Sequence, residues 1–584
     1  MPHILRSEDL AFLLYDMLKI DALATRPAFA ETGREIFDQV LATAERIAEE
    51  QFQPHAAKLD ANEPHFDGER VHIIPEVRKA LDAYVEAGFL TAPFSPDLGG
   101  MGLPFTIHTA VSAWFVAANW STSNYPVLTA AAANLLAHHA SEAQKDTWLA
   151  PLIEGRYFGT MCLSEPHAGS SVGDIRTRAE PQPDGSYRLF GQKMWISGGE
   201  HDLAENIVHL VLAKIPGGPP GTRGISLFIV PRLIEGNRND IRLIGLNHKM
   251  GCRGTVNCAL SFGDGEGATG WLVGEPHQGL AQMFTMMNEM RIGVGMAASS
   301  LAITGYLHAL AYAQDRTQGR PIGAKDPGQP MVPIVEHTDV RRMLLQQKVW
   351  AEGAMALSLY MARLVDLQTS GDLEASRAAT QRLDLLTPVA KSWPSEYGLR
   401  ANELAIQVLG GAGYTRDWPL ERFYRDNRLN HIHEGTRGIQ GLDLLGRKIP
   451  ALNGAALTAL LEEIATDAMA STLPQAQSLA RAAEMVGQAT RSLLAAPDPE
   501  TMLANATLYC DMLGHLMVGW LWLRQAETAA RLLTEATGSR ADFLEGKIAA
   551  YRFFFTHDLP QITTWSTLLS SLDRTALETS AAQL

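Results

Sequence analysis

Cysteine, positive charge and long apolar runs are all scarce in this chain of 584 residues, and each scarcity excludes a class of protein. The cysteines are too few and too widely spaced for a disulfide framework or a zinc site: Cys162, Cys252, Cys258 and Cys510. A formal net charge of -15 argues against general affinity for nucleic acid or anionic membranes. No apolar run approaches the roughly 20 residues that span a bilayer, so no membrane insertion is expected. Acidic side chains near the N-terminus argue against a signal peptide, and a reducing, cytoplasmic location is expected: Glu8, Asp9 and Asp16.

The chain is too long for one hydrophobic core, and its apolar periodicity changes along its length. Apolar residues recur at helical spacing over 37–158, short β-rich runs separated by Pro-Gly clusters occupy 159–277, and helical spacing returns over 278–448. A further helical module of residues 449–584 follows the Ile449-Pro450 boundary, and residues 1–36 form an N-terminal helical extension. The pattern predicts a mostly α protein with a central β domain, an antiparallel sheet or small barrel.

Glu434 stands in the most informative stretch of the sequence. It follows a dense, mostly basic polar run and directly precedes Gly435 and Thr436. Glycine permits close approach of the backbone to a ligand, and threonine supplies a hydroxyl group and an N–H. A carboxylate so placed is a candidate general base beside a bound cofactor. The alternative is a loop whose acidic residue precedes a helix.

Two motifs in the β-rich region carry possible binding chemistry. The first is a strand that runs into a Gly/Ser loop, with backbone N–H groups and hydroxyls suited to a phosphate or a heteroaromatic edge: Met161, Leu163, Ser164, Gly169 and Ser170. A tight turn that closes a hairpin is the alternative. In the second, Trp195 and Ser197 precede a glycine pair at a strand end. The indole suits a flat cofactor, although a strand-end tryptophan usually belongs to a core.

Three further motifs lie in the helical region after residue 278. Asn288 and Arg291 begin a helix with a small-residue face, where a ligand contact and an i, i+4 surface pair are both possible. Arg316 precedes a Gly/Pro-rich loop over 317–333, and its forked guanidinium suits pyrophosphate. A third helix ends in glycines that could be no more than a C-cap: Gln407, Gly410 and Gly411.

In this order and spacing, the six motifs closely resemble those of the acyl-CoA dehydrogenase family over residues 37–447. The resemblance implies a helical domain, a β domain and a second helical domain, with FAD between the last two. The residues then implied to contact FAD are Met161, Leu163, Ser164, Gly169, Ser170, Trp195, Ser197 and Thr436. Those implied to reach the FAD of a partner subunit are Arg316, Gln407, Gly410 and Gly411. The implied substrate-side residues are Ser170, Asn288, Arg291 and Glu434.

The resemblance also implies the reaction. Glu434 removes the α-proton of an acyl-CoA thioester while the β-hydrogen leaves as hydride to flavin N5, which gives a trans-2-enoyl-CoA. Burial beside the flavin raises the pKa of such a base towards the operating pH. The thioester oxygen is held by the N–H of the base residue and a flavin ribityl hydroxyl. Electrons then pass to an electron-transferring flavoprotein, as in fatty acid β-oxidation.

The module after Ile449 resembles that of a larger bacterial branch of the family. This branch includes 3-methylmercaptopropionyl-CoA dehydrogenases and the broad-specificity linear acyl-CoA dehydrogenases of mycobacteria, and the module implies a homodimer. The sequence departs from the family pattern in three places. His433 replaces an aromatic residue, Gly438 replaces a glutamine that touches FAD in many members, and the segment 316–320 is one residue shorter.

Three alternatives remain open at the level of sequence. Acyl-CoA oxidases share the fold and the base but use oxygen. Related flavoproteins of alkylation damage bind DNA through a basic C-terminal domain, whereas residues 449–584 contain 14 acidic and 8 basic side chains. The module could also be an interaction platform, although its apolar runs 513–523 and 548–555 are expected to bury against the body. Acyl chain length and chemistry stay open.

Overall fold

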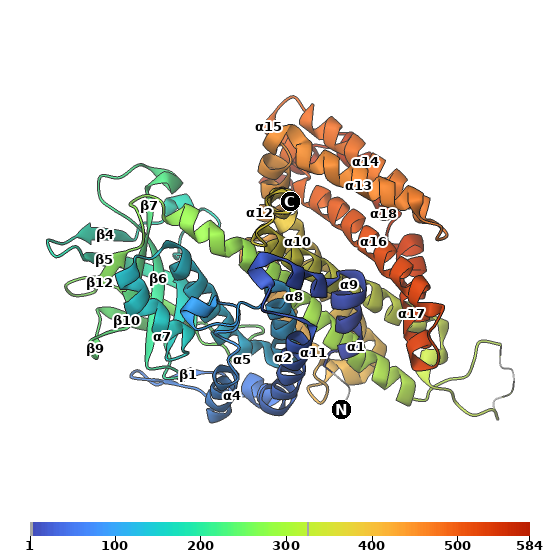
Figure 1. Ribbon diagram of the computed structural model, residues 1–584, viewed down its shortest axis with the longest axis horizontal. Coiled ribbons are helices and arrows are strands. Elements are labelled where there is room, and N and C mark those ends of the chain that lie inside the picture. Colours follow the sequence, from blue (N-terminus) through green and yellow to red (C-terminus); the bar gives the residue numbers. More distant parts are fainter. Residues whose placement is uncertain (1–3, 324–325, 327) are drawn as a thin grey trace. The chain divides into compact units, whose positions relative to one another are not determined.

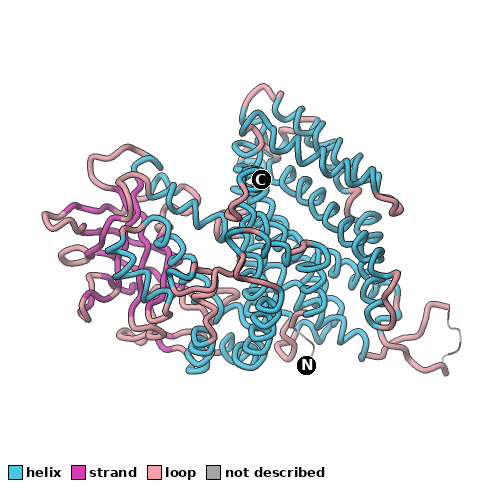
Figure 2. Tube along the Cα trace, in the orientation of Figure 1, coloured by secondary structure: helices cyan, strands magenta, loops and turns pink. Residues whose placement is uncertain are grey.

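The computed structural model describes residues 4–323, 326 and 328–584 and divides the chain into two compact units. The β-containing unit comprises residues 35–290, and the helical unit comprises residues 1–34 and 291–584. Every strand in the described part of the chain lies in the β-containing unit, as Figure 2 shows in magenta. The long helix α8 (Gly279–Asp315) runs from one unit into the other.

The β-containing unit begins with helices that are connected by short turns. They are α2 (Arg34–Ile47), α3 (Ala56–Ala61), α4 (Pro75–Glu86), α5 (Phe105–His139), α6 (Glu142–Gln144) and α7 (Ala150–Ile153). A small hairpin of β1 (His65–Phe66) and β2 (Val71–His72) lies between α3 and α4. The backbone of α5 breaks helical geometry at Asn119, whose amide nitrogen donates to the Phe52 carbonyl at 3.2 Å. The predicted helical region is therefore present, with one kink in its longest helix.

Eight strands of the β-containing unit form one sheet that closes on itself as a barrel over part of its strands. They are β3 (Tyr157–Cys162), β4 (Arg178–Pro181), β5 (Tyr187–Ser197), β6 (Asn206–Lys214), β7 (Ile225–Pro231), β10 (Ile241–Leu246), β11 (Asn257–Phe262) and β12 (Ala268–Leu272). Within the order β10-β11-β5-β12-β7-β6-β3, the strands β5, β12, β7 and β6 form a closed ring because β4 pairs with both β5 and β6; β11 and β10 extend the sheet from β5, and β3 extends it from β6. A separate hairpin joins β8 (Leu233–Ile234) to β9 (Asn237–Arg238).

The prediction of an antiparallel arrangement needs one correction. β3 and β4 each pair with β6 in parallel, whereas the other pairs are antiparallel. A parallel pair requires a long crossover connection, which β4 and β5 provide between β3 and β6. Pro-Gly clusters mark the turns between neighbouring strands, so they do not reveal such long-range pairing. β6 is buried on both faces along almost its whole length, which explains why its residues are apolar on both faces except for the buried His209 and the terminal Asn206 and Lys214.

The helical unit is a bundle around α8, and its other body helices are α9 (Thr338–Gln368), α10 (Leu373–Leu409), α11 (Leu420–Asn427) and α12 (Arg437–Asp443). α8 and α10 run in the same direction, because Gly295 contacts Ala390 while the Asn402 amide donates to the Leu301 carbonyl at 2.9 Å. A Cβ atom on Gly295 would collide with the Ala390 carbonyl oxygen. Small residues on α8 thus permit backbone contact with α10.

The statement that no apolar stretch could span a membrane also needs correction. By length and composition α8 meets that criterion over an 18-residue window, but 89% of this window is buried inside the protein. Its small and apolar residues pack against α10, so the composition reflects a core position.

The added module forms a second layer of helices on this bundle (Figure 1). Its helices are α13 (Ala455–Ala470), α14 (Ala476–Leu494), α15 (Pro499–Leu503), α16 (Ala506–Leu533), α17 (Ser539–His557), α18 (Gln561–Ser570) and α19 (Thr575–Glu578). α16 packs against α9 and α10, and α17 packs against α9. Gly514 lies directly against Trp393, and Gly353 lies against Trp522. The apolar run 513–523 is therefore buried against the body, as predicted, whereas the buried residues of 548–555, among them Tyr551 and Phe554, pack against other parts of the module.

The N-terminal extension is also anchored to the helical unit. It consists of α1 (Ser7–Ala11) and a π-helical turn, Phe12–Met17, rather than one regular helix. The buried ammonium group of Lys547 pairs with Asp9 and, at 2.9 Å, with Glu352. The Phe12 and Phe543 rings meet edge to face at 5.6 Å. This extension thus joins α9 and α17 through one buried charge cluster.

Candidate functional site

The Gly/Ser loop after β3 is attached directly to the end of β5. The loop contains a tight turn in which Glu165 and Ala168 exchange backbone hydrogen bonds of 2.9 and 3.0 Å. The Ser164 carbonyl accepts a hydrogen bond from the Met194 N–H at 3.0 Å, one residue before Trp195. Gly169 and Ser170 are exposed beyond the turn. The structure therefore brings the two predicted motifs of the β domain together.

A buried ion pair between Lys193 and Glu165 holds this loop in place. The Lys193 ammonium group donates to Glu165 Oε1 and to the Leu163 carbonyl, both at 3.0 Å, and both charged side chains are almost completely buried. Glu165 also accepts from the Arg176 N–H at 2.7 Å and the Thr177 N–H at 3.0 Å. Burial alone would raise the pKa of Glu165, but Lys193 and these hydrogen bonds hold it below its usual value.

Replacing Lys193 with methionine is expected to destabilise the β-containing unit strongly. The change leaves the Glu165 carboxylate buried without its cation, a situation that typically costs about 3–5 kcal/mol. For a unit of this size, that cost lowers the thermal unfolding midpoint by about 10 °C, which differential scanning calorimetry measures. Arg242→Met is the matched control, because its pair with Asp264 is exposed. Equal midpoints for the two variants would contradict the structural role of Lys193.

Trp195 is exposed, contrary to the core position usual for a strand-end tryptophan. Its side chain is 61% exposed and its backbone has φ 66°, a left-handed conformation that is rare for a bulky residue. Two residues later, Ser197 Oγ accepts from the Asn257 amide at 3.1 Å. An exposed indole beside a polar loop, held in a strained backbone conformation, fits a planar heteroaromatic ligand.

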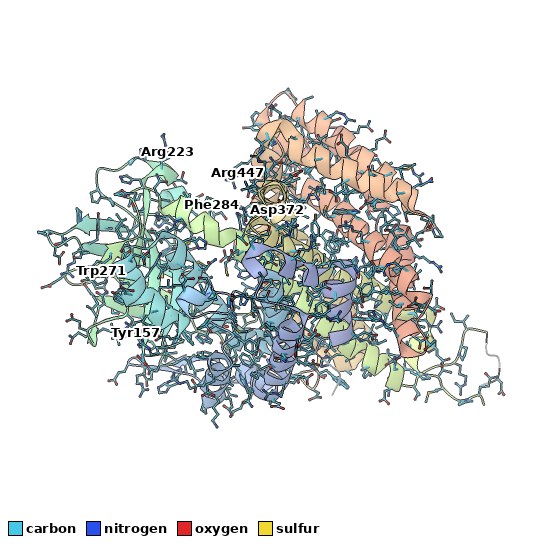
Figure 3. The ribbon with its side chains drawn as sticks, in the orientation of Figure 1. Tyr157, Arg223, Trp271, Phe284, Asp372 and Arg447 are labelled. Atoms are coloured by element: carbon cyan, nitrogen blue, oxygen red, sulfur yellow. The ribbon has the colours of Figure 1, made fainter. Side chains whose placement is uncertain are left out.

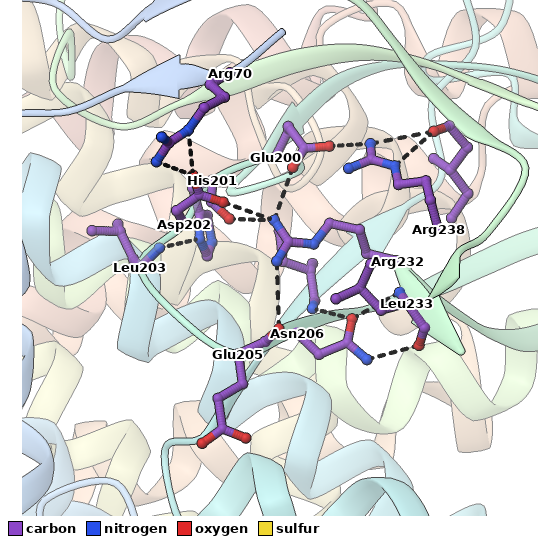
Figure 4. Close-up of polar contacts among 12 residues, drawn as sticks. Arg70, Glu200, His201, Asp202, Leu203, Glu205, Asn206, Arg232, Leu233 and Arg238 are labelled. Atoms are coloured by element: carbon purple, nitrogen blue, oxygen red, sulfur yellow. Dashed lines mark hydrogen bonds and ion pairs between the residues drawn. The ribbon is translucent and has the colours of Figure 1, made fainter. Parts of the chain in front are cut away.

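The segment after β5 is fixed by a buried charge network that sequence reasoning missed (Figure 4). The buried Arg232 guanidinium pairs with Glu200 at 2.9 Å and with the His201 carbonyl at 2.5 Å. Glu200 also pairs with Arg238, and the exposed Asp202 pairs with Arg70 at 3.0 Å. The only sequence signal is the polar run 198–202 between two apolar strands. The network anchors the backbone immediately after Trp195 and Ser197.

In the helical unit, Glu434 lies in a strained loop immediately before α12. Glu434 has φ 52° and Gly435 has φ 86°, so two consecutive residues adopt the left-handed conformation. The Thr436 hydroxyl then caps α12 by accepting from the Ile439 N–H at 3.3 Å. A non-glycine residue in this conformation is held there by its surroundings and often marks a functional site.

Two buried side chains hold this loop through its carbonyl groups. The Lys391 ammonium group, from the middle of α10, donates to the Gly435 carbonyl at 2.7 Å. The Gln440 amide, from α12, donates to the Glu434 carbonyl at 3.0 Å and to the Gly435 carbonyl at 3.3 Å. A Cβ atom at residue 435 would lie 2.6 Å from the Gln440 amide nitrogen. Glycine is therefore required here both for its conformation and for its lack of a side chain.

Burial and the charged groups around the loop shift the pKa of Glu434 and the pKa values of its neighbours Lys391 and His433. Burial raises the pKa of Glu434, and the nearby positive charges of Lys391 and Arg291 oppose this rise. Burial also lowers the pKa of Lys391 to about 7, against the attraction of Glu434. Burial, assisted by Lys391, lowers the pKa of His433 to about 3, so this imidazole is neutral near pH 7. Burial thus makes the Glu434 carboxylate a stronger base than an exposed carboxylate, because it raises the pKa of this group.

Arg291 is buried, so the surface-pair interpretation of this residue is wrong. Its Nη1 donates to Asp443 Oδ2 at 3.0 Å, and its buried Nε has no hydrogen-bond partner among the described residues. Arg447, labelled in Figure 3, donates to the other oxygen of Asp443 at 2.7 Å. Asn288 lies one helical turn before Arg291 and is partly exposed.

The remaining predicted residues lie at or just beyond the C-terminal ends of α8 and α10. They are all exposed: Arg316, Gln407, Gly410 and Gly411. Gly410 ends α10 with φ 59°, so the C-cap interpretation is right. Gln407 follows Lys391 by 16 residues on α10, which corresponds to about 24 Å of helix. The structure therefore does not bring these four residues to the Glu434 loop of the same chain.

Comparisons with known proteins cover nearly the whole chain. Family models match as follows: acyl-CoA dehydrogenase N-terminal domain at 35–156, middle domain at 160–264, C-terminal domain at 277–449, and acetyl-CoA dehydrogenase C-terminal like at 457–580. A 3-methylmercaptopropionyl-CoA dehydrogenase of Ruegeria pomeroyi is 38% identical over 87% of this chain and 88% of its own. The broad-specificity linear acyl-CoA dehydrogenase FadE5 of Mycobacterium tuberculosis is 36% identical over 98% of each chain. The solved acyl-CoA dehydrogenase of Bacillus anthracis complexed with FAD has a TM-score of 0.74 at 20% identity, over 94% of this chain and 93% of that one.

Proposed function

The chain belongs to the acyl-CoA dehydrogenase family of FAD-dependent oxidoreductases, and we propose that it oxidises an acyl-CoA thioester to the trans-2-enoyl-CoA with Glu434 as general base. The observation that carries the proposal is the Glu434 loop. Its backbone is strained and is held by the side chains of Lys391 and Gln440, and burial raises the pKa of its carboxylate. Such a base has the proton affinity required to remove a weakly acidic α-hydrogen.

The backbone of the same residue supplies a donor for the thioester. Among the described residues, none accepts a hydrogen bond from the Glu434 N–H, whereas the neighbouring carbonyls are both occupied. This N–H is left to hold the thioester carbonyl oxygen, where negative charge develops as the α-proton leaves. One residue thus contributes both the base and an oxyanion donor, and the left-handed conformation fixes the two groups relative to each other.

The residues of the β-containing unit fit FAD. The exposed indole of Trp195 offers a flat surface, and the exposed Gly169 and Ser170 of the loop beside it offer N–H groups and a hydroxyl. The residues proposed to hold the cofactor are Met161, Leu163, Ser164, Gly169, Ser170, Trp195, Ser197 and, from the helical unit, Thr436. FAD, when bound, accepts the β-hydrogen as hydride. Ser170, Asn288 and Arg291 are proposed to contact the acyl-CoA.

We further propose that the protein is a homodimer and that an electron-transferring flavoprotein is its electron acceptor. Gln407 lies about 24 Å along α10 from Lys391, too far to serve a flavin held beside Glu434, and Arg316, Gly410 and Gly411 likewise lie at or just beyond helix ends. They are open to solvent at the end of their helices, where a second copy of the chain can approach. Analytical ultracentrifugation tests the dimer, and steady-state assays with purified flavoprotein or oxygen as acceptor separate a dehydrogenase from an oxidase.

An anaerobic titration with acyl-CoA thioesters tests the proposed reaction. The panel includes short and long linear thioesters and 3-methylmercaptopropionyl-CoA, the substrate named for one relative. At least one thioester is expected to bleach the oxidised flavin band of the purified protein after reconstitution with FAD. The thioester that does so at the lowest concentration identifies the substrate class. A bound flavin that no member of the panel bleaches would contradict the proposal.

A further inference from the structure

The added module contacts the helix that follows the Glu434 loop as well as the outer face of the bundle. α12, which follows Glu434 directly, packs against the first residues of α16 (Figure 1). A Cβ atom on Gly441 would lie 2.7 Å from the Ala506 backbone, so the two helices are in backbone contact. A displacement of α16 would therefore also displace α12.

An ion-pair bridge joins the same two helices. Arg437 is the first residue of α12, three residues after Glu434. Its Nη2 donates to both carboxylate oxygens of Asp511 on α16, at 2.6 and 2.7 Å. Its Nη1 donates to Glu396 Oε2 on α10 at 2.5 Å. The side chains of Arg437, Glu396 and Asp511 are 20%, 11% and 9% exposed, so solvent screens this bridge only weakly.

The bridge completes the set of anchors around Glu434. Within the loop itself, Lys391 and Gln440 hold the carbonyls of Glu434 and Gly435. On the following side, Arg437 is held by Glu396 and Asp511. Because α12 is only seven residues long, a shift of Arg437 also moves Gln440, one turn later on the same helix. Of these anchors, Asp511 alone comes from the added module.

We propose that the added module positions the catalytic base, and that Asp511 is the positioning residue, acting through Arg437. The inference rests on the proposed role of Glu434. It explains why a module that supplies no residue to the predicted cofactor contacts is built against α12. Misplacement of a reacting group by about 1 Å costs on the order of 100-fold in rate, so partial loosening of one anchor is expected to cost about 10-fold.

Asp511→Asn tests the proposal, with Glu463→Gln as matched control. Glu463, on α13 of the same module, pairs with Arg382 of α10 at 2.6 Å and does not touch the loop. Both changes remove one charge from an ion pair between module and body. Asp511→Asn is expected to lower the limiting rate of flavin reduction about 10-fold, with the apparent dissociation constant of the thioester changed less than about threefold. Glu463→Gln is expected to leave both values unchanged.

Hydrogen exchange gives a readout that needs neither FAD nor substrate. In Asp511→Asn the hydrogen-bonded amides of α12, residues 439–443, are expected to exchange at least about tenfold faster than in the wild type, whereas Glu463→Gln leaves them unchanged. A double variant, Arg437→Gln with Asp511→Asn, is expected to reduce flavin no more slowly than Arg437→Gln alone, because Asp511 acts through Arg437.

Two results would overturn the proposal: wild-type reduction and exchange in Asp511→Asn, or equal effects of Asp511→Asn and Glu463→Gln. If Asp511→Asn does not fold, Arg437→Lys decides, because it keeps the charge but loses the bidentate contact. A slower reduction in Arg437→Lys supports the positioning role, and an unchanged rate contradicts it. Failure of the proposed function is a separate result, namely that the wild-type flavin is not reduced by any thioester.

Discussion

Glu434→Gln is expected to slow flavin reduction by about 1000-fold or more while the protein still binds FAD. Glutamine has nearly the same shape as glutamate, so the loop, its left-handed backbone and its N–H donor are retained. The amide has no useful proton affinity, and loss of a positioned general base typically costs 10²–10⁴ in rate. Stopped-flow absorbance of the oxidised flavin band measures the effect, and the spectrum before mixing reports the bound flavin.

Glu403→Gln is the control for this change. Glu403 lies on α10, the helix that carries Lys391, and its side chain is exposed. Its loss is expected to leave flavin reduction within about twofold of the wild type. A reduction rate for Glu434→Gln within tenfold of the wild type would show that another group removes the α-proton. It would leave Glu434 with a structural role in its loop.

The elements of the β domain show which parts of the fold the sequence predicts well. The β-rich region predicted at 159–277 contains strands such as β5 and β10, because β-branched and aromatic residues between turn signals are typical of strands. The barrel closure through β4 was not predictable in the same way. It depends on parallel pairing between segments far apart in sequence, for which local composition carries no signal.

The residues of the candidate site also differ in whether their own sequence neighbours predict them. Glu434 could be proposed from its own neighbours, since the Gly-Thr step after it has a local physical meaning. Lys391 could not, because it lies 43 residues earlier in the middle of a helix and contacts the loop only after folding. The same holds for Asp511, whose module was predicted to bury its apolar runs but gave no sign of an ion pair with Arg437.

Trp195 and Arg291 show where residue statistics mislead. A strand-end tryptophan is usually buried and a helical arginine is usually exposed, yet here the indole is exposed and the guanidinium is buried. Both exceptions carry an energetic cost, from exposed apolar surface in one case and from desolvated charge in the other. Such costs are expected where a ligand, rather than the protein alone, completes the environment of a side chain.

Lys391→Met is expected to slow flavin reduction about 100-fold at pH 7 and to change its pH dependence. The change removes the donor to the Gly435 carbonyl, so the loop that carries Glu434 loses its contact with α10. It also removes a positive charge that lowers the pKa of Glu434, so this pKa rises further above its usual value. The acid limb of the pH–rate profile therefore moves to higher pH. Stopped-flow reduction measured from pH 5 to pH 9 gives both effects.

The pH–rate profile of the wild-type protein is expected to show the same interaction between Lys391 and Glu434. Burial lowers the pKa of Lys391 to about 7, so this group loses its charge as the pH rises through that value. The pair then titrates as a unit, and a second inflection near pH 7 is expected in the wild type and not in Lys391→Met. Lys391→Arg is the control for charge, because a guanidinium stays protonated over this pH range. This variant is expected to lose the inflection near pH 7 but to keep the acid limb near its wild-type position. If Lys391→Met keeps both the acid limb and the inflection near pH 7 of the wild type, the ammonium group holds the loop by its hydrogen bond alone and does not act on the charge of Glu434.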